Sequence, residues 1–132
     1  FKVGAQALFC PGVAGMARNQ DPNSANSQFF LMTGIKDDLN GRYAPFGRVL
    51  AGLEVVEAIK PGPASANGQV VDPDLMIRAR TVAAMPEGER PVVRVMNSAS
   101  PAFSALAEQV RAERGVTFNI CDVQPPVQVT GG

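Results

Sequence analysis

The hydrophobic pattern of this chain changes abruptly near residue 28. Residues 18–28 are polar and rich in turn-forming side chains, and the apolar run Phe29-Phe30-Leu31-Met32 follows them directly. The run predicts a buried strand over residues 28–33. Because neighbouring side chains of a strand point to opposite faces, one phenylalanine can enter a core while the other lines a second surface.

Shorter patterns predict the other elements of the first 84 residues. Asn40-Gly41 is a tight-turn pair in which both residues tolerate positive φ, and a strand over 42–49 follows it. Pro45 cannot donate to a ladder, so that strand should have an edge or a bulge there. The further elements expected are a turn and strand over 11–17, a helix over 51–60 ended by Pro61-Gly62, a loop over 61–74 and a strand over 75–85.

A second, self-contained pattern follows a linker at residues 85–90. It predicts a strand over 91–97, a helix over 100–115 and a strand over 116–123, which together form a β-α-β segment. Ser100 is a good N-cap, Pro101 suits the first helical position, and Gly115 ends the helix. Residues 124–132 are expected to be an extended, mobile tail. The predicted division is therefore 1–84 and 85–132, with the second part packed on the first.

Composition excludes several kinds of function. The chain is 45% hydrophobic, and its 12 basic and 12 acidic side chains cancel, so nothing points to nucleic acid or to insertion into a membrane. It has no histidine, which removes the commonest metal ligand and acid/base group. Asp37-Asp38 fits turn residues rather than a metal site, and neither metal nor cofactor is expected. Cys10 and Cys121 fit either a disulfide or two buried thiols.

Two ordered segments resemble the cyclophilin-type peptidyl-prolyl cis-trans isomerases. They read GMARNQDPNSANSQFF over 15–30 and LNGRYAPFGRVLAGLEVVEAI over 39–59. The resemblance implies a mainly β fold with helices, in which residues 1–84 form the C-terminal portion of a cyclophilin-like antiparallel β-barrel and the β-α-β segment is an extension. It also implies that Phe29 is core and that Phe30 is the floor of a pocket for the substrate proline.

The same resemblance implies a set of substrate-binding residues, namely Ala17, Arg18, Gln28, Phe30, Leu39 and Tyr43. Tyr43 stands where many members have histidine, and Asp38 where several have tryptophan. On residue type alone, Phe30 is more often core, and Tyr43 fits an ordinary solvent-facing aromatic. The side chains of Arg18, Arg42 and Arg48 are expected to be solvated, and none is taken as a substitute catalytic arginine.

The family's signature arginine segment is absent from these 132 residues, so we expect Phe1 not to be the natural start and no catalytic residue within the chain. The function implied is peptidyl-prolyl isomerisation in protein folding, with the isolated chain weak or inactive. Alternatives are a non-catalytic module or scaffold that binds proline peptides, and one piece of a protein whose other half is supplied separately.

The expected partners are proline-containing polypeptides. Strands whose neighbours are missing expose edges that favour association, so a second copy of the chain or the missing N-terminal half is a further candidate partner. The likeness to bacterial members with C-terminal extensions implies the bacterial periplasm or cytoplasm, with the periplasm favoured.

Overall fold

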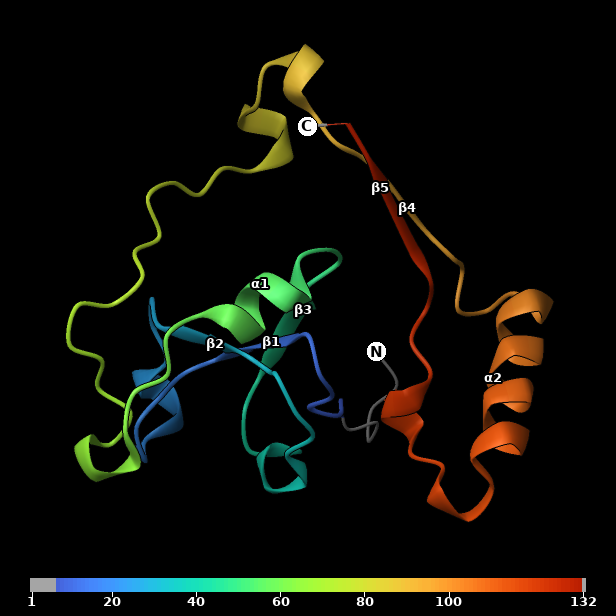
Figure 1. Ribbon diagram of the computed structural model, residues 1–132, viewed down its shortest axis with the longest axis horizontal. Coiled ribbons are helices and arrows are strands. Elements are labelled where there is room, and N and C mark those ends of the chain that lie inside the picture. The colour runs from blue at the N-terminus through green and yellow to red at the C-terminus, as the bar shows by residue number, and fades with distance from the viewer. Residues whose placement is uncertain (1–6, 132) are drawn as a thin grey trace.

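The computed structural model describes residues 7–131, which form two small antiparallel sheets and two helices (Figure 1). The first sheet has the strand order β2-β1-β3, and the second pairs β4 with β5. Short 3₁₀ turns occupy many of the connections. The bounds are β1 Val13–Met16, β2 Phe29–Leu31, β3 Pro45–Arg48, α1 Leu53–Ala58, β4 Val92–Val95, α2 Pro101–Arg114 and β5 Val127–Thr130.

Proline chemistry shapes the edge of the first sheet. Strand β1 pairs with β3 through Ala14 opposite Gly47 and Gly15 opposite Pro45, so the register shifts and Phe46 has no Cα partner. A bulge at this point lets Pro45 join the sheet although it has no N–H to donate. The strand, its edge position among the described residues and its irregularity at Pro45 are confirmed.

The turn before β3 has glycine at the position that needs positive φ. Asn40 is extended at φ −61° and ψ 129°, and Gly41 alone has positive φ, at 71°. The Arg42 N–H donates to the Leu39 carbonyl over 3.1 Å, which closes a type II turn. Such a turn needs positive φ only at its third residue, which Gly41 supplies, so the predicted tight turn at Asn40-Gly41 is confirmed.

Helix α2 begins and ends at the predicted residues. The Ser100 hydroxyl accepts a hydrogen bond from the Phe103 N–H over 3.2 Å, Pro101 takes the first turn, and Gly115 follows the last helical residue. Strand β4 lies where the sequence predicted it, within residues 91–97.

The strand that pairs with β4 lies further along the chain than predicted. Residues 116–123 contain two 3₁₀ turns, because Asn119 and Asp122 form a reciprocal capping box that satisfies the backbone locally. Strand β5 instead forms in the region expected to be a mobile tail, with Val95 opposite Val127 and Val92 opposite Thr130. The strand over 116–123 and the mobile tail over 124–132 were therefore wrong.

Residues 75–85 do not form the predicted strand. They belong to the long segment that connects the first sheet to β4 along the left side and top of Figure 1, where they form no ladder, and Ile77 is 95% exposed. Alternating side chains favour a strand only when a neighbouring strand pairs with it, and no strand within residues 7–131 pairs with this segment.

The described residues form open sheets and no closed barrel. Their most buried apolar side chains are Phe9, Ala14 and Met32, with exposures of 1%, 6% and 8%, which places the core beneath β1. Many large apolar side chains elsewhere are exposed, including Phe46 at 59%. The mixed β and α character is confirmed, whereas the barrel is not seen in this part of the chain. No helix within residues 7–131 is both long and apolar enough to cross a membrane.

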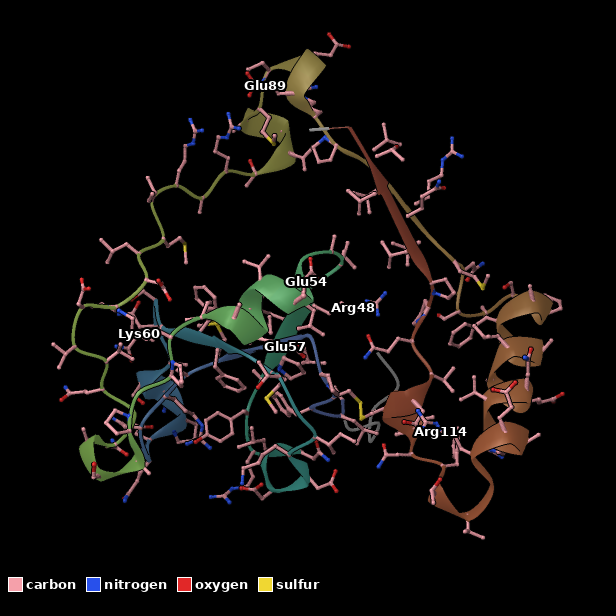
Figure 2. The ribbon with its side chains drawn as sticks, in the orientation of Figure 1. Arg48, Glu54, Glu57, Lys60, Glu89 and Arg114 are labelled. Carbon is pink, nitrogen blue, oxygen red and sulfur yellow. A yellow bond between two sulfur atoms is a disulfide. The ribbon has the colours of Figure 1, made fainter. Side chains whose placement is uncertain are left out.

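A disulfide and three hydrogen bonds join the C-terminal segment to the first sheet and to the residues just before it. Cys10 and Cys121 form a disulfide, so of the two alternatives the structure has the bridge. Arg48 Nη1 and Nη2 donate to the Gln124 side-chain oxygen over 2.6 Å and to the Pro125 carbonyl over 2.7 Å (Figure 2). The Gln124 amide in turn donates to the Pro11 carbonyl over 3.0 Å. Arg48 thus links the first sheet to the C-terminal segment, and the expectation of a solvated Arg48 side chain was wrong. The division of the chain into residues 1–84 and 85–132 stays a prediction.

Candidate functional site

The pairing of β1 with β2 builds an aromatic cluster on one face of the first sheet. Gly15 lies opposite Phe30 in the ladder, and Phe9 packs beside both. The Phe30 ring centroid lies 5.6 Å from that of Phe9 and 5.8 Å from that of Tyr43, which meets it edge-on at 87°. These distances suit attractive aromatic pairs, so Phe30 is fixed from two sides while it remains half-buried.

Gly15 makes this cluster possible because it has no side chain. A Cβ built on Gly15 would overlap Phe30 Cζ and would lie 2.7 Å from Phe9 Cε1. Both neighbours are aromatic rings packed against each other, so neither can move aside alone. The glycine is therefore needed for the close approach of the two rings.

We predict that Gly15→Ala destabilises the chain by about 2 kcal/mol, since overpacking a well-filled core typically costs about 1–3 kcal/mol. Urea unfolding followed by circular dichroism measures the loss. Gly34→Ala is the matched control, because a Cβ there meets nothing within 4 Å and the glycine does not have positive φ. Equal midpoints for the two variants would contradict the role given to Gly15.

A hollow of about 240 Å³ opens beside the aromatic cluster. Five of the six residues predicted to bind substrate line it, and they come from the end of β1, from β2 and from the turn before β3. They are Ala17, Arg18, Phe30, Leu39 and Tyr43. We call this hollow the aromatic pocket. The structure brings these residues together, and their role toward a substrate stays a prediction.

Gln28, the sixth predicted residue, lies next to the aromatic pocket and does not line it. It lines a neighbouring hollow of about 320 Å³ with Ala17 and Arg18. The Ala17 N–H donates to the Gln28 carbonyl over 3.0 Å, which extends the β1–β2 ladder by one step. The Gln28 side chain is exposed and free to turn toward either hollow.

Phe29 was expected in the core and is not there. Its side chain is 46% exposed and meets Phe46 edge-on, with ring centroids 6.3 Å apart. The alternation along β2 does send the two phenylalanines to opposite faces, but residues 7–131 leave the Phe29 face largely uncovered. The expectation of a buried Phe29 was therefore wrong for this part of the chain.

Arg18 holds the rim of the aromatic pocket in place. Its Nε and Nη2 donate to the Arg42 carbonyl over 3.2 and 2.7 Å, and Nη1 donates to the carbonyls of Asn19 and Gln20 over 2.8 and 3.1 Å. The guanidinium carbon also lies 4.9 Å from the Tyr43 ring centroid, a cation–π distance. A simply solvated Arg18 was thus a wrong expectation.

One residue and one contact important to this geometry were not predicted from the sequence. Phe9 supports Phe30 from below and is 1% exposed, yet its only sequence signal was one apolar position before Cys10-Pro11. The contact between Arg18 and the turn at Arg42 joins residues 24 positions apart, and no spacing rule predicts it.

The charges beside Leu39 form a separate pair. Lys36 Nζ lies 3.2 Å from Asp38 Oδ1, and this hydrogen bond lowers the pKa of Asp38 below its ordinary value. Both side chains are well exposed, at 61% and 59%. Water screens such a pair, so it contributes little to stability and leaves the pocket wall at Leu39 apolar.

Known proteins are similar to this chain in sequence over part of their length. A 71-residue stretch is 49% identical to the "Probable peptidyl-prolyl cis-trans isomerase" of Brucella abortus, covering 54% of this chain and 36% of that protein. A 62-residue stretch is 40% identical to the "Peptidyl-prolyl cis-trans isomerase" of Acinetobacter baylyi, covering 43% and 33%. The chain therefore spans about a third of the length of these relatives.

The crystal structure of cyclophilin AquaCyp293 from Hirschia baltica aligns with a TM-score of 0.78 at 31% identity, over 95% of this chain and 44% of that one. The model of the family "Cyclophilin type peptidyl-prolyl cis-trans isomerase/CLD" matches residues 4–81, more than half of the sequence. This chain belongs to the cyclophilin-type peptidyl-prolyl cis-trans isomerase family.

Proposed function

We propose that the aromatic pocket binds the proline ring of a polypeptide and serves the cis-trans isomerisation of X–Pro bonds. The observation that carries the proposal is the pocket itself. An aromatic floor at Phe30, an aromatic wall at Tyr43 and an aliphatic wall at Leu39 border an open hollow of about 240 Å³. A proline ring is compact and apolar, and such a surface excludes water from it.

Isomerisation needs no nucleophile and no metal, because no covalent bond breaks. Rotation about the X–Pro bond faces a barrier of about 18–20 kcal/mol from amide resonance. A site lowers the barrier when it binds the twisted amide more tightly than the planar one. Phe30, Tyr43 and Leu39 would hold the ring still, which gives the rest of the amide a fixed point about which to rotate.

Among residues 7–131, Arg18 is the single cation that lines the aromatic pocket, and most of its N–H groups point to backbone carbonyls. Four of its N–H groups donate to backbone carbonyls. A donor aimed at the prolyl nitrogen would favour the twisted amide, and Arg18 is poorly placed to serve as that donor. The residues of the aromatic pocket are therefore better suited to binding the proline ring than to accelerating rotation about the X–Pro bond. This favours, as a second candidate function for the chain alone, a module that binds proline segments.

Tyrosine fluorescence tests the proposal directly, because Tyr43 is the single tyrosine and the chain has no tryptophan. We predict that an Ala-Pro peptide changes the Tyr43 emission in a saturable way, whereas the matched Ala-Ala peptide does not. Tyr43→Phe supplies the spectroscopic blank. Identical titrations with the two peptides would rule out a proline site.

A proline-isomerisation assay on the same sample separates the two candidate functions. Binding without acceleration supports the module for the chain alone. Acceleration abolished by Tyr43→Ala would assign the isomerase activity to the chain itself, and would contradict the view that the pocket residues lack the donor.

We further propose an oxidising compartment, with the bacterial periplasm as the candidate. The Cys10–Cys121 disulfide supports this location, because disulfides persist in oxidising compartments and are rare in the cytosol.

A further inference from the structure

We propose that the aromatic pocket selects X–Pro segments that carry an acidic side chain directly beside the proline. The inference rests on the proposed function and names its substrate class. It comes from a second hollow, of about 250 Å³, on the other side of the Tyr43 wall. Two arginines, Arg18 and Arg42, line this hollow, and no acidic side chain does. We call it the arginine hollow.

Arg18 presents its charge to the arginine hollow without the freedom of an ordinary surface arginine. Hydrogen bonds to the carbonyls of Asn19, Gln20 and Arg42 use four of its five N–H groups. One Nη2 N–H is left over for a ligand. Because the guanidinium is already fixed, binding of a carboxylate there does not include the entropy cost of ordering the Arg18 side chain.

Arg42 adds a second positive charge from the turn before β3. Its backbone carbonyl accepts from Arg18, but within residues 7–131 its guanidinium has no hydrogen-bond partner. None of the ion pairs in the described part of the chain involves Arg18 or Arg42. Both charges are therefore open to a carboxylate from another molecule.

The acidic side chains in the adjoining loops have other contacts. Asp21 Oδ1 accepts from the Asn23 N–H over 2.9 Å, and Asp37 Oδ1 accepts from the Asn40 amide over 3.3 Å. Asp38 is paired with Lys36. None of the three lines the arginine hollow. The Arg42 charge contributes to the lowered pKa of Asp38, but within residues 7–131 neither Arg18 nor Arg42 forms an ion pair.

The two hollows are close enough to be filled by neighbouring residues of one peptide. Arg18 and Tyr43 line both of them, so a single side-chain wall separates them. Successive Cα atoms lie about 3.8 Å apart. This shared lining is why we expect a proline ring in the aromatic pocket to bring the side chain of its neighbour to the arginine hollow, where a carboxylate would meet Arg18 and Arg42.

The test compares Glu-Pro and Pro-Glu peptides with Gln-Pro and Pro-Gln peptides by titration of the Tyr43 emission of the full chain. At about 20 mM salt we expect one of the two glutamate peptides to bind about three- to tenfold more tightly than its glutamine counterpart. The advantage should shrink at about 500 mM salt and in Arg42→Gln. Arg78→Gln is the matched control, because it removes the same charge from an exposed position outside both hollows.

Each outcome decides between the inference and the proposed function. Equal affinities for glutamate and glutamine peptides overturn the inference and leave proline binding intact. An equal advantage for a glutamate placed five residues from the proline, or an equal loss in Arg78→Gln, shows general attraction and also overturns it. If no proline peptide alters the emission, whatever its charge, the proposed function fails together with the inference.

Discussion

Removal of the Cys10–Cys121 disulfide is expected to lower the free energy of unfolding of this chain by about 4 kcal/mol. The bridge joins residues 111 positions apart, and a loop of about that length restricts the unfolded chain strongly. It also holds residues 121–125 where Gln124 and Pro125 meet Arg48. Loss of the bridge therefore acts on the unfolded state and weakens a native contact as well.

Urea unfolding of the oxidised chain and of the double variant Cys10→Ala/Cys121→Ala measures this effect by circular dichroism. A dithiol reductant should bring the oxidised chain close to the variant and leave the variant itself unchanged. Amide hydrogen exchange should show the earliest loss of protection in β4 and β5, which the bridge and the Arg48 contacts connect to the first sheet. A variant that unfolds at the same urea concentration as the oxidised chain would refute the structural role of the bridge.

Local chemistry predicted those elements whose hydrogen bonds close within a few residues. The Ser100 cap, Pro101 and Gly115 define α2 by interactions that the sequence itself contains. Pro45 likewise predicted the irregular edge at β3, because a missing N–H is a property of one residue.

A strand forms only where another strand pairs with it, and the predictions of strands were wrong where the sequence could not indicate that pairing. Residues 75–85 alternate well but have no pairing strand in the described part of the chain. Residues 116–123 have apolar side chains typical of a strand, yet the capping box at Asn119 satisfies the backbone within one turn. Strand β5 follows Pro125-Pro126, a pair that usually interrupts regular secondary structure. The strand forms because all four of its residues pair with β4.

The candidate site was more predictable than the fold around it. The resemblance placed Phe30, Leu39 and Tyr43 in one pocket, and the antiparallel pairing of β1 with β2 assembles that pocket. The sequence could not indicate the residues that hold the pocket in shape. Phe9 and the Arg18 clamp act through contacts between segments distant in sequence, which only the folded chain reveals.

Substitution of the pocket floor is expected to remove peptide binding. Phe30→Ala takes away the ring that packs on both Phe9 and Tyr43, so a bound proline loses its largest apolar contact and Tyr43 loses its edge-on partner. We expect the affinity for an Ala-Pro peptide to fall by about thirty- to a hundredfold, or about 2–3 kcal/mol, as for a buried anchor residue. Titration of the Tyr43 emission measures the fall.

Phe46→Ala is the matched control for this experiment, since it deletes the same ring from the first sheet at a position that does not line the aromatic pocket. Its side chain is 59% exposed and contacts Phe29, so peptide affinity should change by less than about twofold. Circular dichroism of both variants establishes whether the sheets remain folded. If the folded Phe30→Ala chain binds the peptide as tightly as Phe46→Ala does, the proline does not rest on Phe30, because an anchor that can be deleted without loss of affinity makes no contact with the ligand.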